Sequence, residues 1–132
     1  MTPPGQPPDP QSQARLAARA ALEKQAEEVL ILDLRGVSTI ADYFVLCTAD
    51  NPRQLGALRD HLEAVLRKAG APLWHVEGSP ASTSSSTPDG PPQWILMDCG
   101  ALVIHLFDRP ARAFYRLEQF WADTPRVPMD AA

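Results

Sequence analysis

The sequence predicts an α/β (α+β) domain in which helices flank a mixed sheet of about five strands. Segments with apolar residues at helical spacing are interspersed along the chain with short β-branched and aromatic runs. One of these runs is too apolar to have a solvent face, which is typical of a strand in the middle of a sheet. At 132 residues, the chain is long enough for one domain with a substantial core.

The N-terminal part predicts a helix followed by two strands. Residues 1–11 are rich in Pro, Gly and Gln, and we expect a disordered tail there. Ser12 is a suitable N-cap for a helix over 13–30, whose Ala-rich first turns are expected to pack loosely. Its apolar stripe is predicted to be Leu22, Ala26, Val29 and Leu30. Residues 31–35 predict a first strand and residues 42–48 a central strand.

The clearest helix follows Asp50 and Asn51, either of which can cap it, and it ends near Gly70. Its apolar residues recur at helical spacing on one face, at Leu55, Leu58, Leu62, Val65, Leu66 and Ala69. A short strand is predicted at 73–77. Residues 78–92 are rich in Ser and Pro and too polar to offset their ordering entropy, so we expect a mobile loop.

The C-terminal part predicts two more strands and a last helix. The run WILMDCGALVIHLF (94–107) is apolar on both sides of Asp98-Cys99-Gly100, a pattern typical of a tight turn. RPARAFYRLEQFWAD (109–123) predicts the helix, and residues 128–132 a tail. The domain is therefore expected to span residues 12–127.

Composition limits the classes of partner. The chain has 12 Lys and Arg against 16 Asp and Glu, a net charge of −4, which argues against broad binding of nucleic-acid phosphates. An acidic protein suits a basic protein partner. The N-terminus lacks the pattern of a signal peptide, and no apolar run reaches the ~18 residues of a membrane span. We expect a cytoplasmic protein whose two cysteines, Cys47 and Cys99, are buried and reduced.

The sequence lacks the motifs that are typical of an enzyme active site. Nucleotidyl transfer would need a Gly-Ser loop at a helix start and paired carboxylates for metal ions. Asp33 and Asp98 are single carboxylates, and the three histidines have no metal-ligand spacing. We therefore expect no catalytic residue, no cofactor and no metal, and an enzyme remains the weaker alternative.

Four segments in this order carry a family resemblance: GVSTIADYFVLCTADNPRQ (36–54), HVEG (75–78), WILMDCGALVIHLF (94–107) and RAFYRLEQFWAD (112–123). Together they resemble the ribosomal silencing factor family, RsfS, also called Iojap-like, over roughly residues 13–127. The sequence departs from the family's usual WxLLDYGDVVVH pattern at Cys99, where a Tyr is usual, and at Ala101, where an acid is usual. Pro110 stands where an acidic residue is common, and the Ser/Pro-rich loop is longer than usual.

The resemblance implies a fold with nucleotidyltransferase-like topology that lacks the catalytic apparatus. It also implies binding to the fourteenth protein of the large ribosomal subunit, which blocks joining of the small subunit and lowers translation when nutrients are short. The free protein is expected to be a homodimer, with no direct nucleic-acid contact required and no membrane. The second alternative is a dimeric scaffold with another partner.

The candidate partner-binding residues lie in three places. Strand alternation puts Val103, His105 and Phe107 on one face of their strand, and it puts Trp94 and Asp98 on one face of theirs. The hairpin face is the first candidate, with a core role for His105 as its alternative. In the last helix, too many large side chains are present for one sheet to bury easily. Tyr43, beside a turn, is the third place, where plain turn chemistry is the alternative. The full candidate set is Trp94, Asp98, His105, Phe107, Tyr115, Glu118, Trp121 and Tyr43.

Overall fold

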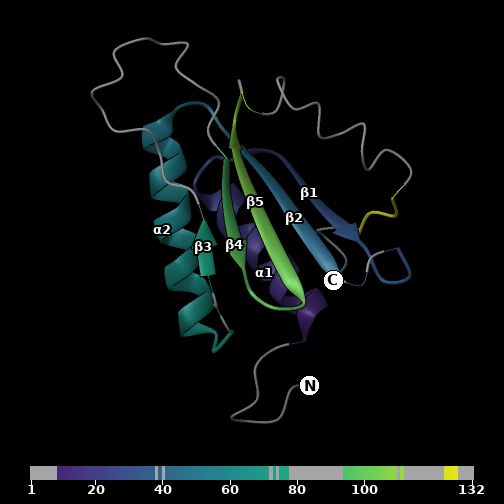
Figure 1. The fold of residues 1–132 in the computed structure, drawn as a ribbon. Helices are drawn as coiled ribbons and strands as arrows, with labels where there is room; N and C mark the ends of the chain where they lie inside the picture. The colour runs from purple at the N-terminus through teal and green to yellow at the C-terminus, as the bar shows by residue number, and fades with distance from the viewer. Residues whose placement is uncertain are drawn as a thin grey trace.

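The computed structural model describes residues 9–37, 39, 41–71, 73, 75–77, 94–109, 111 and 124–127. In this part of the chain two helices and five strands follow one another (Figure 1). They are α1 (Pro10–Glu23), β1 (Glu27–Asp33), β2 (Tyr43–Ala49), α2 (Pro52–Lys68), β3 (His75–Glu77), β4 (Trp94–Asp98) and β5 (Leu102–Asp108). Of the predicted last helix, Arg109 and Ala111 are helical, and residues 110 and 112–123 lie outside the described residues. Neither described helix combines the length and apolar character needed to cross a membrane.

The five strands form one sheet in the order β1-β2-β5-β4-β3, which confirms the predicted mixed sheet. Only β2 and β5 run parallel, and the other described pairs are antiparallel. The predicted tight turn joins β4 to β5. Asp98 Oδ1 accepts a hydrogen bond of 2.9 Å from the Gly100 backbone N–H, and Gly100 has φ of 84°, a conformation that glycine adopts at no steric cost.

Helix α1 ends earlier than predicted. Asp9 caps it by accepting a hydrogen bond of 2.9 Å from the Ser12 backbone N–H, so Ser12 is not the cap. The chain leaves the helix after Glu23 and enters β1 at Glu27, where it pairs with β2. The predicted continuation to residue 30 is wrong because pairing with β2 overrides the helix propensity of this stretch.

The Ala-rich face of α1 is also packed more tightly than predicted. Five alanines on it are buried, Ala14, Ala17, Ala18, Ala20 and Ala21, whereas Leu22 is 46% exposed. Small side chains let a helix lie close to its neighbours, and α1 contacts α2 as well as β1, β2 and β5. The predicted stripe that included Leu22 is therefore wrong.

Helix α2 matches its prediction. Asn51 is the cap, its Oδ1 accepting a hydrogen bond of 2.8 Å from the Gln54 backbone N–H. Gly70, at φ 75°, follows the C-cap. Leu55, Leu58, Leu62 and Leu66 are fully buried in the same core cluster as the alanines of α1. Both helices therefore cover the same face of the sheet (Figure 1).

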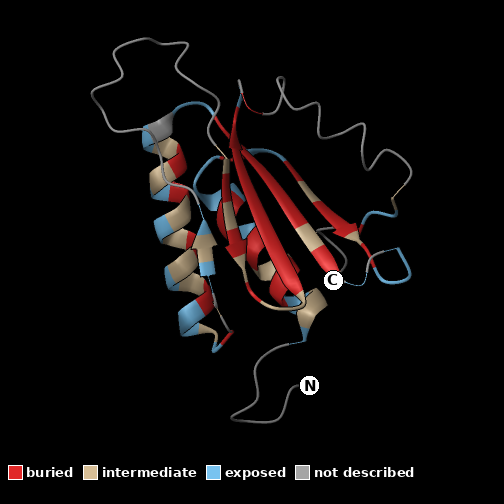
Figure 2. Cartoon of the chain, in the orientation of Figure 1, coloured by how far each residue is buried: buried red, intermediate tan, exposed pale blue. Residues whose placement is uncertain are grey.

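A smaller apolar cluster lies on the opposite face of the sheet. It consists of Leu32, Leu34, Leu46, Phe107 and Ala111, with Leu30, Phe44 and Trp94 half-buried against it. The central strands β2 and β5 are buried along almost their whole length (Figure 2). Both cysteines are buried, as predicted. The outer edge of β1 pairs with residues 125–127, through hydrogen bonds from Asp33 N–H to the Pro125 carbonyl (2.8 Å) and from Val127 N–H to the Ile31 carbonyl (2.9 Å).

Candidate functional site

The candidate site is the face of the sheet that points away from α1 and α2, called the second face below. The strand register brings its residues together: Leu46 pairs with His105, which pairs with Leu96. In the neighbouring rows, Phe107 pairs with Trp94 and Val103 with Asp98. Leu102, Ile104 and Leu106 belong instead to the helix-side core. The alternation predicted for the hairpin is thus confirmed, and four of the candidate residues share one face: Trp94, Asp98, His105 and Phe107.

Aromatic rings form the centre of the second face. The His105 ring lies edge-on to Phe44, with centroids 4.5 Å apart, and nearly parallel to Phe107, at 6.0 Å and 8°. Trp94 completes the cluster, with its centroid 5.2 Å from that of Phe107. Its indole Nε1–H donates a hydrogen bond of 3.1 Å to His105 Nδ1. Because an indole N–H can only donate, Nδ1 must carry a lone pair rather than a proton.

Burial explains the protonation state of His105. Its side chain is 4% exposed, and the loss of solvation lowers its pKa from 6.5 to about 4. The imidazole is therefore neutral at pH 7. Phe107 is 1% exposed, so both residues form the floor of the face rather than its outer surface. Their direct contact with a partner stays a prediction, and their burial argues for the core role that was the alternative for His105.

Trp94 and Asp98 are half-buried and keep some accessible surface. Asp98 is also engaged in the β4–β5 turn through Gly100, so one of its oxygens already has a structural task. On the neighbouring strand β3, Glu77 is exposed and pairs with Leu96, which puts a second carboxylate at this border of the second face. His75, exposed and opposite Asp98 in the register, has its Nε2 3.1 Å from Glu77 Oε1. The accessible part of the second face therefore combines apolar and acidic groups with one imidazole.

Tyr43 lies elsewhere. It is 3% exposed and belongs to the helix-side core, because it alternates with Val45 and Cys47 along β2. This burial argues against direct contact between Tyr43 and a partner, and Phe44 is the residue that β2 presents to the second face there. The Arg35 guanidinium lies 5.3 Å from the centroid of the Tyr43 ring. The remaining candidates, Tyr115, Glu118 and Trp121, lie outside the described residues.

The described residues offer no acidic cluster for a metal-dependent reaction. Asp33 forms an ion pair with Arg35 (2.8 Å), and hydrogen bonding from the Arg35 side chain lowers the pKa of Asp33. No group of three His, Cys, Asp or Glu side chains is placed to hold a metal ion within the part of the chain that the structure describes.

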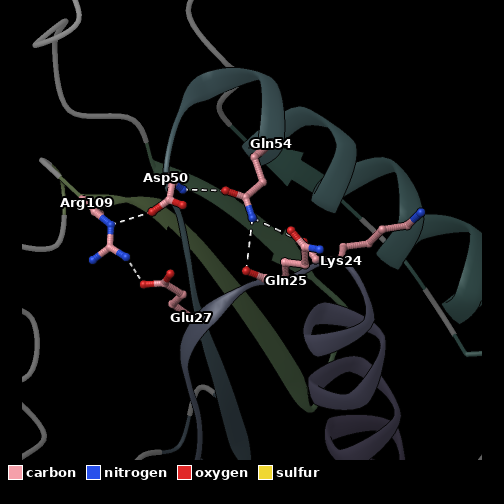
Figure 3. A network of polar contacts seen from close by, with 6 residues as sticks. All are labelled: Lys24, Gln25, Glu27, Asp50, Gln54 and Arg109. Atoms are coloured by element: carbon pink, nitrogen blue, oxygen red, sulfur yellow. Dashed lines mark hydrogen bonds and ion pairs between the residues drawn. The ribbon is translucent and has the colours of Figure 1, made fainter.

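A polar network that the sequence analysis missed lies where β2 and β5 end and α2 begins (Figure 3). Arg109 forms ion pairs with Glu27 and with Asp50, the latter at 2.6 Å. Gln54 accepts a hydrogen bond of 2.7 Å from the Asp50 backbone N–H. Its amide Nε2 donates to the carbonyls of Lys24 (3.3 Å) and Gln25 (3.2 Å). Gln54 and Arg109 thus hold the turn between α1 and β1 against the central strands.

An open pocket of about 480 Å³ lies beside this network. Apart from Ala57, the residues that line it carry cationic, carboxylate or amide side chains: Lys24, Gln25, Glu27, Asp50, Asn51, Arg53 and Gln54. Gln25 and Glu28 have φ of 64° and 50°, a left-handed conformation that costs free energy in non-glycine residues. Gln54 Nε2 donates a hydrogen bond to the Gln25 carbonyl, which helps to hold Gln25 in this conformation. No local pattern in the sequence signals the long-range contacts of the network, which span 29 to 82 residues.

The structure defines an α+β domain whose second face carries an aromatic floor beneath the half-buried Trp94. A comparison with protein families gives the next step. The sequence model described as "Ribosomal silencing factor during starvation" (RsfS) matches residues 7–132. The chain therefore belongs to the ribosomal silencing factor family, a family of ribosome-associated regulators of translation, and the resemblance noted in the sequence is confirmed.

Curated relatives and solved structures agree with the family assignment. The chain is 33% identical over 116 residues to "Ribosomal silencing factor RsfS" of Halalkalibacterium halodurans, covering 88% of this chain and 91% of the relative. It is 31% identical to the RsfS of Bacillus subtilis, covering 88% and 90%. A crystal structure of a protein from Bacillus halodurans superimposes with a TM-score of 0.71 at 30% identity, covering 89% of this chain and 98% of that one. A chloroplastic Iojap protein of Zea mays is 29% identical over 115 residues, which cover 86% of this chain and 46% of that longer relative.

Proposed function

We propose that this chain represses translation by binding the fourteenth protein of the large ribosomal subunit and sterically blocking the small subunit. The family match over residues 7–132 is the observation that carries the proposal. The relatives named above as ribosomal silencing factors cover nearly the whole domain, so the proposal does not rest on a short motif.

Steric occlusion requires occupancy and no chemistry. At a free concentration about ten times the dissociation constant, about nine in ten large subunits would be occupied by mass action. An interface of ordinary size, ~800 Å² on each partner, is sufficient if a few anchors are well buried.

We place the interface on the accessible part of the second face. Trp94 has the residue type most enriched among interface anchors, and it is half-buried above the aromatic floor. Asp98 and Glu77 border it with negative charge, and the net charge of −4 favours encounter with a basic ribosomal protein. Tyr115, Glu118 and Trp121 of the last predicted helix remain part of the proposed surface. A free homodimer is proposed to cover the same surface.

The test is co-sedimentation of the full chain with purified large subunits through a sucrose cushion. We expect the wild-type protein in the pellet with the large subunits. Trp94→Ala should weaken binding to the large subunit about tenfold or more, as expected for an interface anchor. Leu22→Ala is the matched control, because Leu22 is an exposed apolar residue on α1, which packs on the other face of the sheet. Absence of wild-type protein from the pellet would leave the dimeric scaffold as the better hypothesis. If folded Trp94→Ala binds large subunits as well as wild type does, Trp94 is not part of the interface.

A further inference from the structure

We infer that His105 is a positioning residue that holds the indole of Trp94 in one orientation on the second face. The inference deepens the proposed function and rests on it where contact between Trp94 and a partner is concerned. It assigns His105 a task distinct from partner contact, which its burial disfavours.

The strand register makes the pairing possible. His105 on β5 lies directly opposite Leu96 on β4, so Trp94 is its diagonal neighbour on the same face. Diagonal neighbours are within reach of each other when the side chains are large. The indole Nε1–H meets Nδ1 at 3.1 Å, a good distance for a hydrogen bond.

The acceptor is itself held firmly. Phe44 contacts the imidazole edge-on at 4.5 Å, and Phe107 lies parallel to it at 6.0 Å. Its neighbours in the register, Leu46 and Leu96, come from the strands on either side. A ring packed in this way has little freedom to turn, so Nδ1 is a fixed point toward which the indole N–H is directed.

The chemistry of the pair determines what Trp94 offers outward. An indole has one hydrogen-bond donor, and here that donor points inward to His105. The accessible part of the ring is then an apolar edge and a π face, which suit an aliphatic pocket or a cationic side chain on a partner. A Trp ring without a fixed hydrogen bond would have to be ordered on binding, which weakens affinity by about three- to tenfold.

Two substitutions at His105 separate positioning from packing. His105→Asn keeps an acceptor near the place of Nδ1 but loses the ring, whereas His105→Phe keeps the ring but loses the acceptor. If His105 positions the indole, the Asn variant retains the wild-type affinity for large subunits and the Phe variant loses about three- to tenfold. If His105 only packs, the order is reversed, which would overturn the inference.

Trp94→Phe supplies the matched background, because it keeps an aromatic ring and lacks the N–H. In this background His105→Phe should cause no further loss of binding, since its effect acts through the indole N–H. Equal losses from His105→Phe in both backgrounds would overturn the inference, even if Trp94 is a true anchor.

A measurement on the free protein keeps the test independent of the ribosome. The indole N–H resonance of Trp94, identified by its absence in Trp94→Phe, should exchange slowly with solvent in wild type and His105→Asn and rapidly in His105→Phe. Fast exchange in folded wild type would overturn the inference. Slow exchange together with absent large-subunit binding would overturn the proposed function and leave the hydrogen bond supported.

Discussion

Acidification should destabilise the fold through His105 before most carboxyl groups are protonated. His105 is buried and its pKa falls from 6.5 to about 4 because burial disfavours the imidazolium. The unfolded chain therefore binds a proton between these two values that the folded chain does not. The contribution of the neutral His105 to the free energy of unfolding is therefore fully present above pH 6.5 and is lost as the pH falls toward 4.

The size of the effect follows from the same shift. At 1.36 kcal/mol for each unit of pKa, the loss of unfolding free energy from His105 amounts to roughly 3 kcal/mol at pH 4 and below. Asp33, whose pKa is lowered because Arg35 donates hydrogen bonds to it, adds its own loss at lower pH. A loss of this size is a large part of the stability of an ordinary domain.

Urea unfolding at a series of pH values between 7 and 4, followed by far-UV circular dichroism, measures this loss directly. His105→Asn should flatten the curve in this range, because it removes the titrating group. A slope in His105→Asn as steep as in wild type would refute the assignment to His105.

Three further predictions concern stability. Ala18→Leu should lower the free energy of unfolding by about 1–3 kcal/mol, because the alanine face of α1 is closely packed. Arg19→Leu, on the exposed side of the helix, should leave the stability unchanged, and thermal melting compares the two variants. Asn51→Ala should cost about 1 kcal/mol by removing the cap of α2, whereas Asn51→Asp should retain most of the stability; equal losses in chemical denaturation would contradict the capping role. Ile104→Ala, in the fully buried middle of β5, should cost about 2–5 kcal/mol, and a loss below 1 kcal/mol would contradict its place in the core.

Local patterns in the sequence were sufficient where local physics decides the structure. Helix α2 carries its cap, its apolar face and its terminal glycine within one segment, and the hairpin carries its turn between two alternating strands. In these elements the lowest-energy local structure and the tertiary structure agree, so the boundaries, the alternating faces and the buried leucines were predictable.

Patterns failed where distant contacts decide. The stretch after Glu23 has good helix propensity, yet pairing of β1 with β2 begins at Glu27. Tyr43 and Phe44 are adjacent aromatics, and only the position of the helices determines that Tyr43 is the buried one on the helix side. The ion pair between Arg109 and Asp50 joins residues 59 positions apart, which no motif signals.

The same distinction applies to the candidate site. Alternation correctly put Trp94, Asp98, His105 and Phe107 on one face, because each strand follows a two-residue repeat. Alternation cannot tell the floor of a face from its surface, since that depends on which neighbours cover each side chain. The burial of His105 and Phe107 beside the half-buried Trp94 supplies this missing information, and the hydrogen bond between Trp94 and His105 joins the accessible ring to its buried neighbour.

A subunit-joining assay tests the proposed function most directly. Purified large subunits are incubated with the full chain, small subunits are added, and formation of joined ribosomes is followed by light scattering and by sedimentation. Wild type should suppress joining in proportion to its occupancy of large subunits, Leu22→Ala should act like wild type, and Trp94→Ala should require a higher concentration. Unimpaired joining at a concentration of wild type that saturates large subunits would contradict the proposed steric block.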